Sequence, residues 1–255
     1  MQKLTREQKK IKKKLRILQK SAIESGINGV LLQQLNYIYN YKQETANNGS
    51  NKKLIVIKYA YSSRPIIVKN AISDWRASRE FSYDLFKRLY ERTAGSYESL
   101  EDGCQFLNFK TDLFTLKEVF SMPEDRVRNK PGQKPWYVGW GNCHPDILAA
   151  VRQYYSPPTF LPDDAEFPAT ENIFFGYEIG AVMHLDYIPR LMWQGQVKGN
   201  KTWSIAPVLE CDHICQKFDF YVEAGDVVLL DTRIWYHATS IPKGQFSMTV
   251  QSEYG

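Results

Sequence analysis

The stretch Glu171-Asn172-Ile173-Phe174-Phe175-Gly176-Tyr177 opens a series of short β-rich runs that continues to the end of the chain. Glycine, proline and aspartate separate the runs, as they do short strands joined by turns. We expect eight strands, at about residues 171–178, 181–187, 191–198, 201–206, 218–223, 226–231, 234–239 and 245–253. No helical spacers separate them. The sequence therefore predicts a double sheet of the jelly-roll, double-stranded β-helix type rather than a layered α/β fold.

The residues before this region predict helices and a few strands. Apolar side chains recur at helical spacing near residues 83–92, 116–120 and 145–154, and strand-like runs stand near 54–59 and 65–68. The expected fold class is mainly β (α+β), with a barrel core at about 171–255 and helical support on its N-terminal side.

Length and composition bound the class of protein. The chain has 255 residues, 43% of them hydrophobic and 14% aromatic, which suits one large globular domain with or without an arm. Disordered and collagen-like chains are excluded. Four scattered cysteines predict no disulfide framework, and no apolar run is long enough to predict a membrane span.

The net charge of +5 is unevenly distributed. Residues 1–20 contain nine basic residues and one acid, Glu7, a local charge of +8, which leaves 5 − 8 = −3 for the remainder. Leu4, Ile11, Leu15 and Leu18 form an apolar stripe, so this arm predicts a helix. It could dock on the body with a solvated basic face, contact nucleic acid or an anionic lipid surface, or adjoin a membrane anchor. With the polar linker at 44–52, it defines an arm at 1–52 before a domain at 53–255.

Two His-x-Asp patterns offer candidate metal ligands. His144-Pro145-Asp146 stands where a helix is expected to begin, and a carboxylate in the first turn is explained by the helix dipole. His184-Leu185-Asp186 stands in an expected strand, where residues two apart point to the same face. With His237 on a later strand, this pair would give two imidazoles and one carboxylate, the facial triad of non-haem iron oxygenases. The competing interpretation is two core histidines and a turn aspartate.

Lys201 follows the turn Lys198-Gly199-Asn200 and begins the strand expected at 201–206, in which several side chains are expected to point into the barrel. A lysine inside a barrel is costly unless it meets an anion. A dicarboxylic cosubstrate would supply that anion, although a lysine at a hairpin end is more commonly solvated.

Several motifs in a fixed order resemble a known family. They are Arg64-Pro65-Ile66-Ile67-Val68 through Asp74-Trp75, His184-Leu185-Asp186, residues 195–201, Gly225-Asp226-Val227-Val228 and Trp235-Tyr236-His237. Together they resemble the cupin-like JmjC branch of the 2-oxoglutarate- and Fe(II)-dependent oxygenases, and among these are similar to the asparaginyl hydroxylase that acts on hypoxia-inducible factor. The resemblance covers about residues 60–255.

The resemblance implies roles for individual residues. His184, Asp186 and His237 would bind Fe(II) and form the catalytic centre. Lys201 and Tyr137 would hold the far carboxylate of 2-oxoglutarate, and Gln251 would line its pocket. The threonine that the family places just before the first iron histidine is absent, since residues 180–183 are Gly-Ala-Val-Met. Tyr137 or Tyr177 could replace that hydroxyl.

Four further residues near the triad in sequence are candidates for the substrate mouth: Tyr187, Arg190, Trp193 and Trp235. Aromatic residues at such positions are more often part of the core. The motif Cys211-Asp212-His213-Ile214-Cys215 allows zinc binding, a disulfide or an unremarkable loop, and the last interpretation is favoured.

The resemblance implies a dioxygenase that consumes O₂ and 2-oxoglutarate, releases succinate and CO₂, and hydroxylates a protein or peptide side chain. Alternatives are a demethylase or an oxygenase of RNA or small molecules, and a cupin-fold binding module without turnover. We expect an intracellular protein, cytoplasmic or nuclear.

Overall fold

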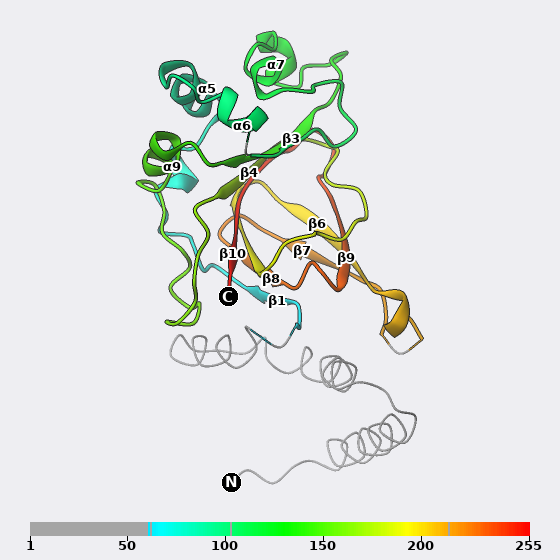
Figure 1. Cartoon of the computed structure of the whole chain (residues 1–255). Coiled ribbons are helices and arrows are strands. Elements are labelled where there is room, and N and C mark those ends of the chain that lie inside the picture. Colours follow the sequence, from blue (N-terminus) through cyan, green and yellow to red (C-terminus); the bar gives the residue numbers. More distant parts are fainter. Residues whose placement is uncertain (1–60, 62, 103, 214) are drawn as a thin grey trace, which may run out of the picture.

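A computed structural model describes residues 61, 63–102, 104–213 and 215–255 (Figure 1). The basic arm, the linker and the strand expected at 54–59 lie outside the described residues. Among the described residues, no helix is long and apolar enough to cross a membrane.

Two antiparallel sheets form the body of the protein. The larger sheet has seven strands in the order β1-β8-β5-β10-β4-β3-β2, and the smaller has three in the order β7-β6-β9. The strands are β1 (Ile66–Val68), β2 (Phe106–Leu107), β3 (Tyr137–Asn142), β4 (Glu171–Tyr177), β5 (Leu191–Lys198), β6 (Lys201–Pro207), β7 (Phe218–Val222), β8 (Val227–Leu230), β9 (Trp235–Ser240) and β10 (Phe246–Tyr254). This arrangement is the predicted jelly-roll type of double sheet.

Helices cover the outer face of the larger sheet near β3 and β4 (Figure 1). They are α4 (Ala77–Glu80), α5 (Tyr83–Arg92), α6 (Glu98–Asp102), α7 (Leu116–Phe120), α8 (Glu124–Val127) and α9 (Pro145–Val151). In α5, the Ser82 side chain caps the first turn by accepting from the Leu85 amide. One face of α5 buries Phe86, whose ring packs edge-on against Trp140 of β3 at 5.6 Å.

Alternation along the strands separates two environments. In β4, Ile173 and Phe175 face the helices and belong to the main core, whereas Asn172 and Phe174 face the interior between the sheets. Gly139 of β3 also faces that interior. A Cβ there would lie 2.3 Å from the Phe174 ring, so glycine is required for the ring to occupy its place.

Most of the predicted elements are confirmed. Seven of the eight expected strands correspond to β4 through β10, the run at 65–68 corresponds to β1, and the helices expected near 83–92 and 116–120 are α5 and α7. The helix expected at 145–154 ends at Val151, and its N-cap is His144, whose Nδ1 accepts from the Asp146 amide at 3.3 Å. The structural interpretation of that His-x-Asp pattern is confirmed.

Two expectations about strands were wrong or incomplete. Residues 181–187 do not form a regular strand, because their pairing with β9 is interrupted and leaves one isolated bridge, between His184 and His237. The sequence reasoning also missed β3, which lies between β4 and the edge strand β2 in the larger sheet, because its Gly139 and Gly141 obscure the strand pattern.

Candidate metal centre and cosubstrate cavity

A bulged segment beside β9 carries two of the predicted triad residues. The Thr239 amide donates to the Ala181 carbonyl, the Ala181 amide donates to Thr239 Oγ1, and His184 and His237 exchange two backbone hydrogen bonds of 2.9 and 3.1 Å. Between these two pairs, residues 182 and 183 lie opposite a single residue, Ala238. The extra residue is a β-bulge, which re-aims the side chains that follow it. This bulge explains why residues 181–187 do not form a regular strand. It also explains why the side chains of His184 and Asp186 still converge with His237.

Gly180 begins this segment in a conformation that needs glycine. Its φ is +86°, and a Cβ would lie 2.2 Å from the carbonyl oxygen of Thr239. The Asp186 amide, at the other end, donates to the Thr232 carbonyl at 3.0 Å. The backbone is therefore fixed on both sides of His184.

The triad side chains meet at one point. Ligand atoms of His184, Asp186 and His237 all lie within 4.8 Å of one another. His184 Nε2 is 3.3 Å from Asp186 Oδ1, and His237 Nε2 is 3.8 Å from Asp186 Oδ2. The convergence predicted from sequence is present.

Both imidazoles are oriented by backbone carbonyls. His184 Nδ1 lies 2.6 Å from the Val182 oxygen, and His237 Nδ1 lies 3.2 Å from the Trp235 oxygen. If each Nδ1 carries the proton and donates to its carbonyl, each Nε2 presents a lone pair toward Asp186. Orientation of a ligating histidine through its other nitrogen is typical of metal sites.

The surroundings shift the pKa values of all three ligand candidates, and binding of a cation would displace the proton that His184 shares with Asp186. Burial lowers the pKa of His237 to about 4, so its imidazole is neutral. Burial also opposes the charged form of His184, but hydrogen bonds to Asp186 and to the Val182 carbonyl outweigh it and raise the His184 pKa. Burial disfavours the Asp186 carboxylate, and its contacts with the histidines prevail to lower the pKa. Two nitrogen donors and one carboxylate fit Fe(II), with coordination positions left open.

A second feature of the same cavity is a fully buried lysine. Lys201, at the start of β6, is 1% exposed, and burial lowers its pKa to about 7. Its Nζ donates to the Tyr137 hydroxyl at 2.8 Å, to Gln194 Oε1 at 3.2 Å and to Thr249 Oγ1 at 3.3 Å. None of these three partners is a carboxylate, so the described residues give the ammonium group polar contacts without a counter-charge.

These groups share one cavity of about 100 Å³. Its lining includes the whole triad together with Tyr137, Lys201 and Gln251. Gln251 Oε1 accepts from Gln194 Nε2 at 2.7 Å, which connects it to the lysine contacts. A buried cation beside a metal-ligand triad is the environment that a dianionic, metal-chelating cosubstrate needs.

The hydroxyl missing before His184 has other sources. Thr249 contacts Lys201 directly, and Thr239 lines the cavity. Tyr137 is in place, but Tyr177 lines a separate groove with Phe81 and Trp136, so Tyr177 does not replace the missing threonine.

The structure does not gather the four mouth candidates at the cavity, since none of them lines it. Trp193 is fully buried on the helix side of β5, where it contacts Trp75, and the Trp235 indole donates to the Ser63 carbonyl at 2.9 Å. Arg190 pairs with Glu166 at 3.2 Å. Tyr187, which follows Asp186 in the chain, is fully exposed, whereas both tryptophans are buried.

The motif at 211–215 forms no metal site among the residues that can be described. Cys215 is buried, His213 lies 3.9 Å from the carboxylate of its neighbour Asp212, and the triad is the one metal-ligand group found among the described residues. The side chain of Cys211 is outside the described part. Cys104 and Cys143, by contrast, are joined as a disulfide with a Cα–Cα distance of 6.1 Å, although the sequence predicted no framework.

Sequence reasoning missed several residues of the cavity wall. Gln194 and Thr249 hold Lys201, and Phe109 packs on Tyr137 with ring centres 5.4 Å apart. Gln194 and Thr249 alternate with core residues on their strands, so the strand period gave a signal for their inward direction. Phe109 is in a loop, where the sequence gives no such signal.

Comparisons with known proteins support the fold. No protein-family model matches the chain. One crystal structure of YcfD from Escherichia coli has a TM-score of 0.51 with 16% sequence identity and covers 84% of this chain and 54% of that chain. Another, described as the E. coli ribosomal oxygenase YcfD, has a TM-score of 0.50 with 16% identity and covers 82% and 52%. A third, of YcfD in complex with cobalt and 2-oxoglutarate, has a TM-score of 0.46 with 16% identity and covers 75% and 47%.

This chain thus spans about half the length of the solved structures it matches. At this identity the likeness establishes the shared double-sheet fold. The narrower resemblance to the asparaginyl hydroxylase stays a prediction.

Proposed function

We propose that the protein is a 2-oxoglutarate- and Fe(II)-dependent dioxygenase that hydroxylates a side chain of a protein or peptide. The observation that carries the proposal is the placement of the triad and Lys201 in one cavity. Either feature alone has a structural explanation. A dicarboxylate that binds both would explain why a metal-ligand triad lies beside a buried lysine that pairs with no carboxylate among the described residues.

His184, Asp186 and His237 would hold the iron. With 2-oxoglutarate and O₂, bound iron would supply the oxidation of a C–H bond, in which one oxygen atom enters the product alcohol, the other enters succinate, and CO₂ leaves. The protein's own residues position the reactants. Lys201, Tyr137 and Thr249 would anchor the far carboxylate, and the neutral His237 keeps its lone pair available because burial disfavours its protonation.

A macromolecular substrate is favoured by the surface around the triad. On the bulged segment, Val182 is 43% and Met183 47% exposed, and Tyr187, directly after it, is 101% exposed. Exposed apolar and aromatic side chains in one segment are typical of interaction surfaces. The E. coli protein of similar fold is described as a ribosomal oxygenase, which is consistent with a protein substrate here.

The test is turnover by the full chain with Fe(II), 2-oxoglutarate and candidate peptides, followed by succinate release and the mass of the peptide. We expect an increase of one oxygen atom in the peptide and loss of both signals in Asp186→Ala. Formaldehyde release would instead identify a demethylase. Binding of iron and 2-oxoglutarate without succinate from any substrate would identify a binding module, and absence of iron binding would refute the proposal.

A further inference from the structure

A groove lined by both apolar and charged side chains lies on the other side of β2 from the cosubstrate cavity. It has a volume of about 410 Å³, and its lining includes Tyr97, Glu98, Leu100, Glu101, Phe106 and Phe114. Figure 1 shows the helices α6 and α7, which flank it, at the end of the molecule that carries β3.

The segment after residue 104 connects the groove and the cavity. Gln105, Leu107 and Phe109 line the cavity, whereas Phe106 lines the groove. A polypeptide bound in the groove would therefore lie next to the cavity, with only the short strand β2 between the two.

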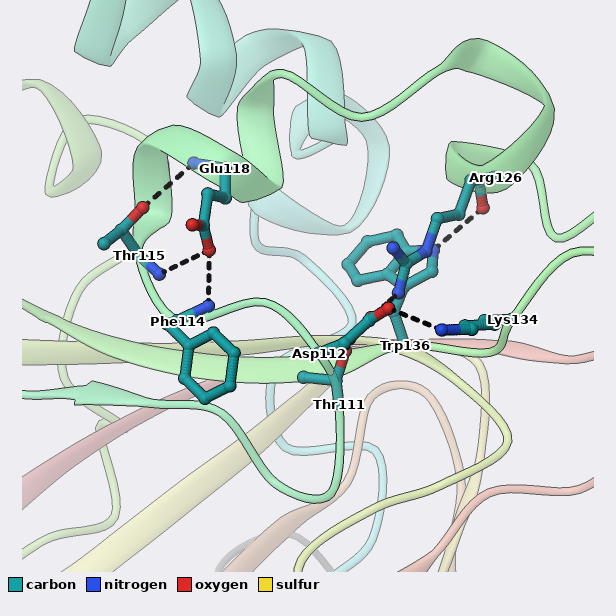
Figure 2. A network of polar contacts seen from close by, with 8 residues as sticks. All are labelled: Thr111, Asp112, Phe114, Thr115, Glu118, Arg126, Lys134 and Trp136. Carbon is teal, nitrogen blue, oxygen red and sulfur yellow. Dashed lines mark hydrogen bonds and ion pairs between the residues drawn. The ribbon is translucent and has the colours of Figure 1, made fainter.

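Phe114 is an exposed aromatic residue on a rigid turn. It is 67% exposed, yet its amide donates to Glu118 Oε2 at 2.6 Å. The next residue, Thr115, caps α7 in a reciprocal capping box with Glu118. Figure 2 shows the Phe114 ring extending away from these contacts.

The other side of this turn is anchored as well. Asp112 is paired with Arg126 and, at 3.0 Å, with Lys134 (Figure 2). Hydrogen bonds from both cations lower the Asp112 pKa to about 2, so the carboxylate stays charged at physiological pH. Because the turn is fixed at both ends, Phe114 would lose little conformational freedom on binding, which is a property of anchor residues in interfaces.

The charge around the groove indicates the class of partner. Helix α6 carries Glu98, Glu101 and Asp102 within five residues, all exposed or partly exposed. No cation among the described residues lies within ion-pair distance of these three carboxylates, and the one basic residue in the groove lining is Lys117. The groove thus combines apolar side chains, an exposed aromatic residue and exposed carboxylates in one lining.

We infer that this groove is a docking site for a basic, amphipathic segment of the polypeptide substrate, outside the residue that is modified. The inference rests on the proposed function for the identity of the partner as a substrate. Apolar side chains of the segment would pack against Phe114 and Phe106, and its lysine or arginine side chains would face Glu98 and Glu101. Such a site raises the local concentration of substrate at the cavity without taking part in the reaction.

The test measures binding of two labelled peptides to the full chain by fluorescence anisotropy. One is an amphipathic peptide of lysine and leucine, and in the other every lysine is replaced by glutamate. We expect the basic peptide to bind at the groove and the acidic one not to bind there; any contact of the acidic peptide with the basic residues 1–20 should be unchanged in the groove variants. Affinity should fall about tenfold or more in Phe114→Ala and in Glu98→Lys/Glu101→Lys.

Matched controls separate this site from general electrostatics. Leu209→Ala removes an apolar side chain that is 76% exposed elsewhere, and Glu210→Lys/Asp219→Lys reverses two exposed acidic residues away from the groove. Both controls should bind the basic peptide as the wild type does. Equal loss in the controls, no binding by the wild type, or binding of the acidic peptide that is weakened by Phe114→Ala would overturn the inference.

The same variants distinguish the inference from the proposed function. Iron and 2-oxoglutarate binding should be unchanged in Phe114→Ala and Glu98→Lys/Glu101→Lys, because these residues do not line the cavity. If the wild type binds the basic peptide at the groove but not iron or 2-oxoglutarate, the docking site stands and the dioxygenase proposal fails. If the wild type binds iron and 2-oxoglutarate but no peptide at the groove, the docking site fails and the dioxygenase proposal stands.

Discussion

Substitution of Lys201 by methionine should stabilise the ligand-free protein and abolish its response to 2-oxoglutarate. Lys201 is 1% exposed, and its Nζ has three neutral hydrogen-bond partners. Burial lowers its pKa from 10.5 to about 7. Methionine has a similar shape and no charge, so it removes the desolvation cost while filling most of the space.

The magnitude follows from proton linkage. Below about pH 7 the buried lysine is charged in the folded protein, and the difference between its folded and unfolded pKa values then destabilises the fold by about 5 kcal/mol. Above pH 7 the folded state loses the proton while the unfolded state keeps it up to about 10.5. Stability of the wild type therefore rises with pH across this window. At about pH 9 the remaining cost is roughly 2 kcal/mol.

Loss of the hydrogen bonds offsets part of this gain. Each contact to Tyr137, Gln194 and Thr249 contributes about 1 kcal/mol. We therefore expect Lys201→Met to be more stable than the wild type by about 2 kcal/mol near pH 6, and this advantage to disappear near pH 9.

The assay is urea unfolding of the metal-free protein at the two pH values, with and without 2-oxoglutarate. Lys198→Met, at the other end of the same turn, is the control. Burial also lowers the Lys198 pKa, but this side chain is only partly buried, so its pH-dependent gain should be much smaller than that of Lys201→Met. Excess 2-oxoglutarate should stabilise the wild type and leave Lys201→Met unchanged. A stability difference between Lys201→Met and the wild type that is independent of pH, or a variant less stable at pH 6, would refute the reasoning.

Three further predictions concern other parts of the fold and site. His184→Ala should abolish binding of Fe(II) measured by calorimetry, whereas His144→Ala, which removes only a helix cap, should bind Fe(II) normally and lose about 1 kcal/mol of stability. Gly139→Ala should destabilise the protein by about 1–3 kcal/mol in urea unfolding and weaken 2-oxoglutarate binding, because the new Cβ displaces Phe174 into the cavity; unchanged 2-oxoglutarate affinity would contradict this. Asp226→Ala should lower the free energy of unfolding, measured in urea, by about 3 kcal/mol or more. The carboxylate is 1% exposed, accepts from the Asn70 and Glu223 amides and pairs with a lysine, so a loss below about 1 kcal/mol would contradict this prediction.

Much of the fold could be predicted because the signals are local. Alternating apolar residues and turn formers in 191–198, 218–223 and 245–253 mark strands in any jelly roll, and the structure confirms them. The helix at 83–92 was equally clear, since its buried Phe86 and Tyr90 follow the helical period. Strand β3 was not predicted, because two glycines and a tryptophan at 139–141 give a weak strand pattern and only pairing with β4 makes them a strand.

The sequence by itself determined the strand series and the set of chemical groups in the site. Alternation fixes which residues share a face, and His184, Asp186, His237 and Lys201 are recognised by residue type and order. Only the tertiary structure decided how these groups meet. The bulge opposite Ala238 aims His184, and the burial of Lys201 among its three polar partners depends on residues from β3, β5 and β10.

The exposure of Phe114 was also decided by the tertiary structure, since nothing in its local sequence distinguishes it from a core phenylalanine. The physical reason is the same in each instance. Desolvation, register and exposure depend on segments that are far apart in the chain, whereas periodicity and ligand type are properties of neighbouring residues.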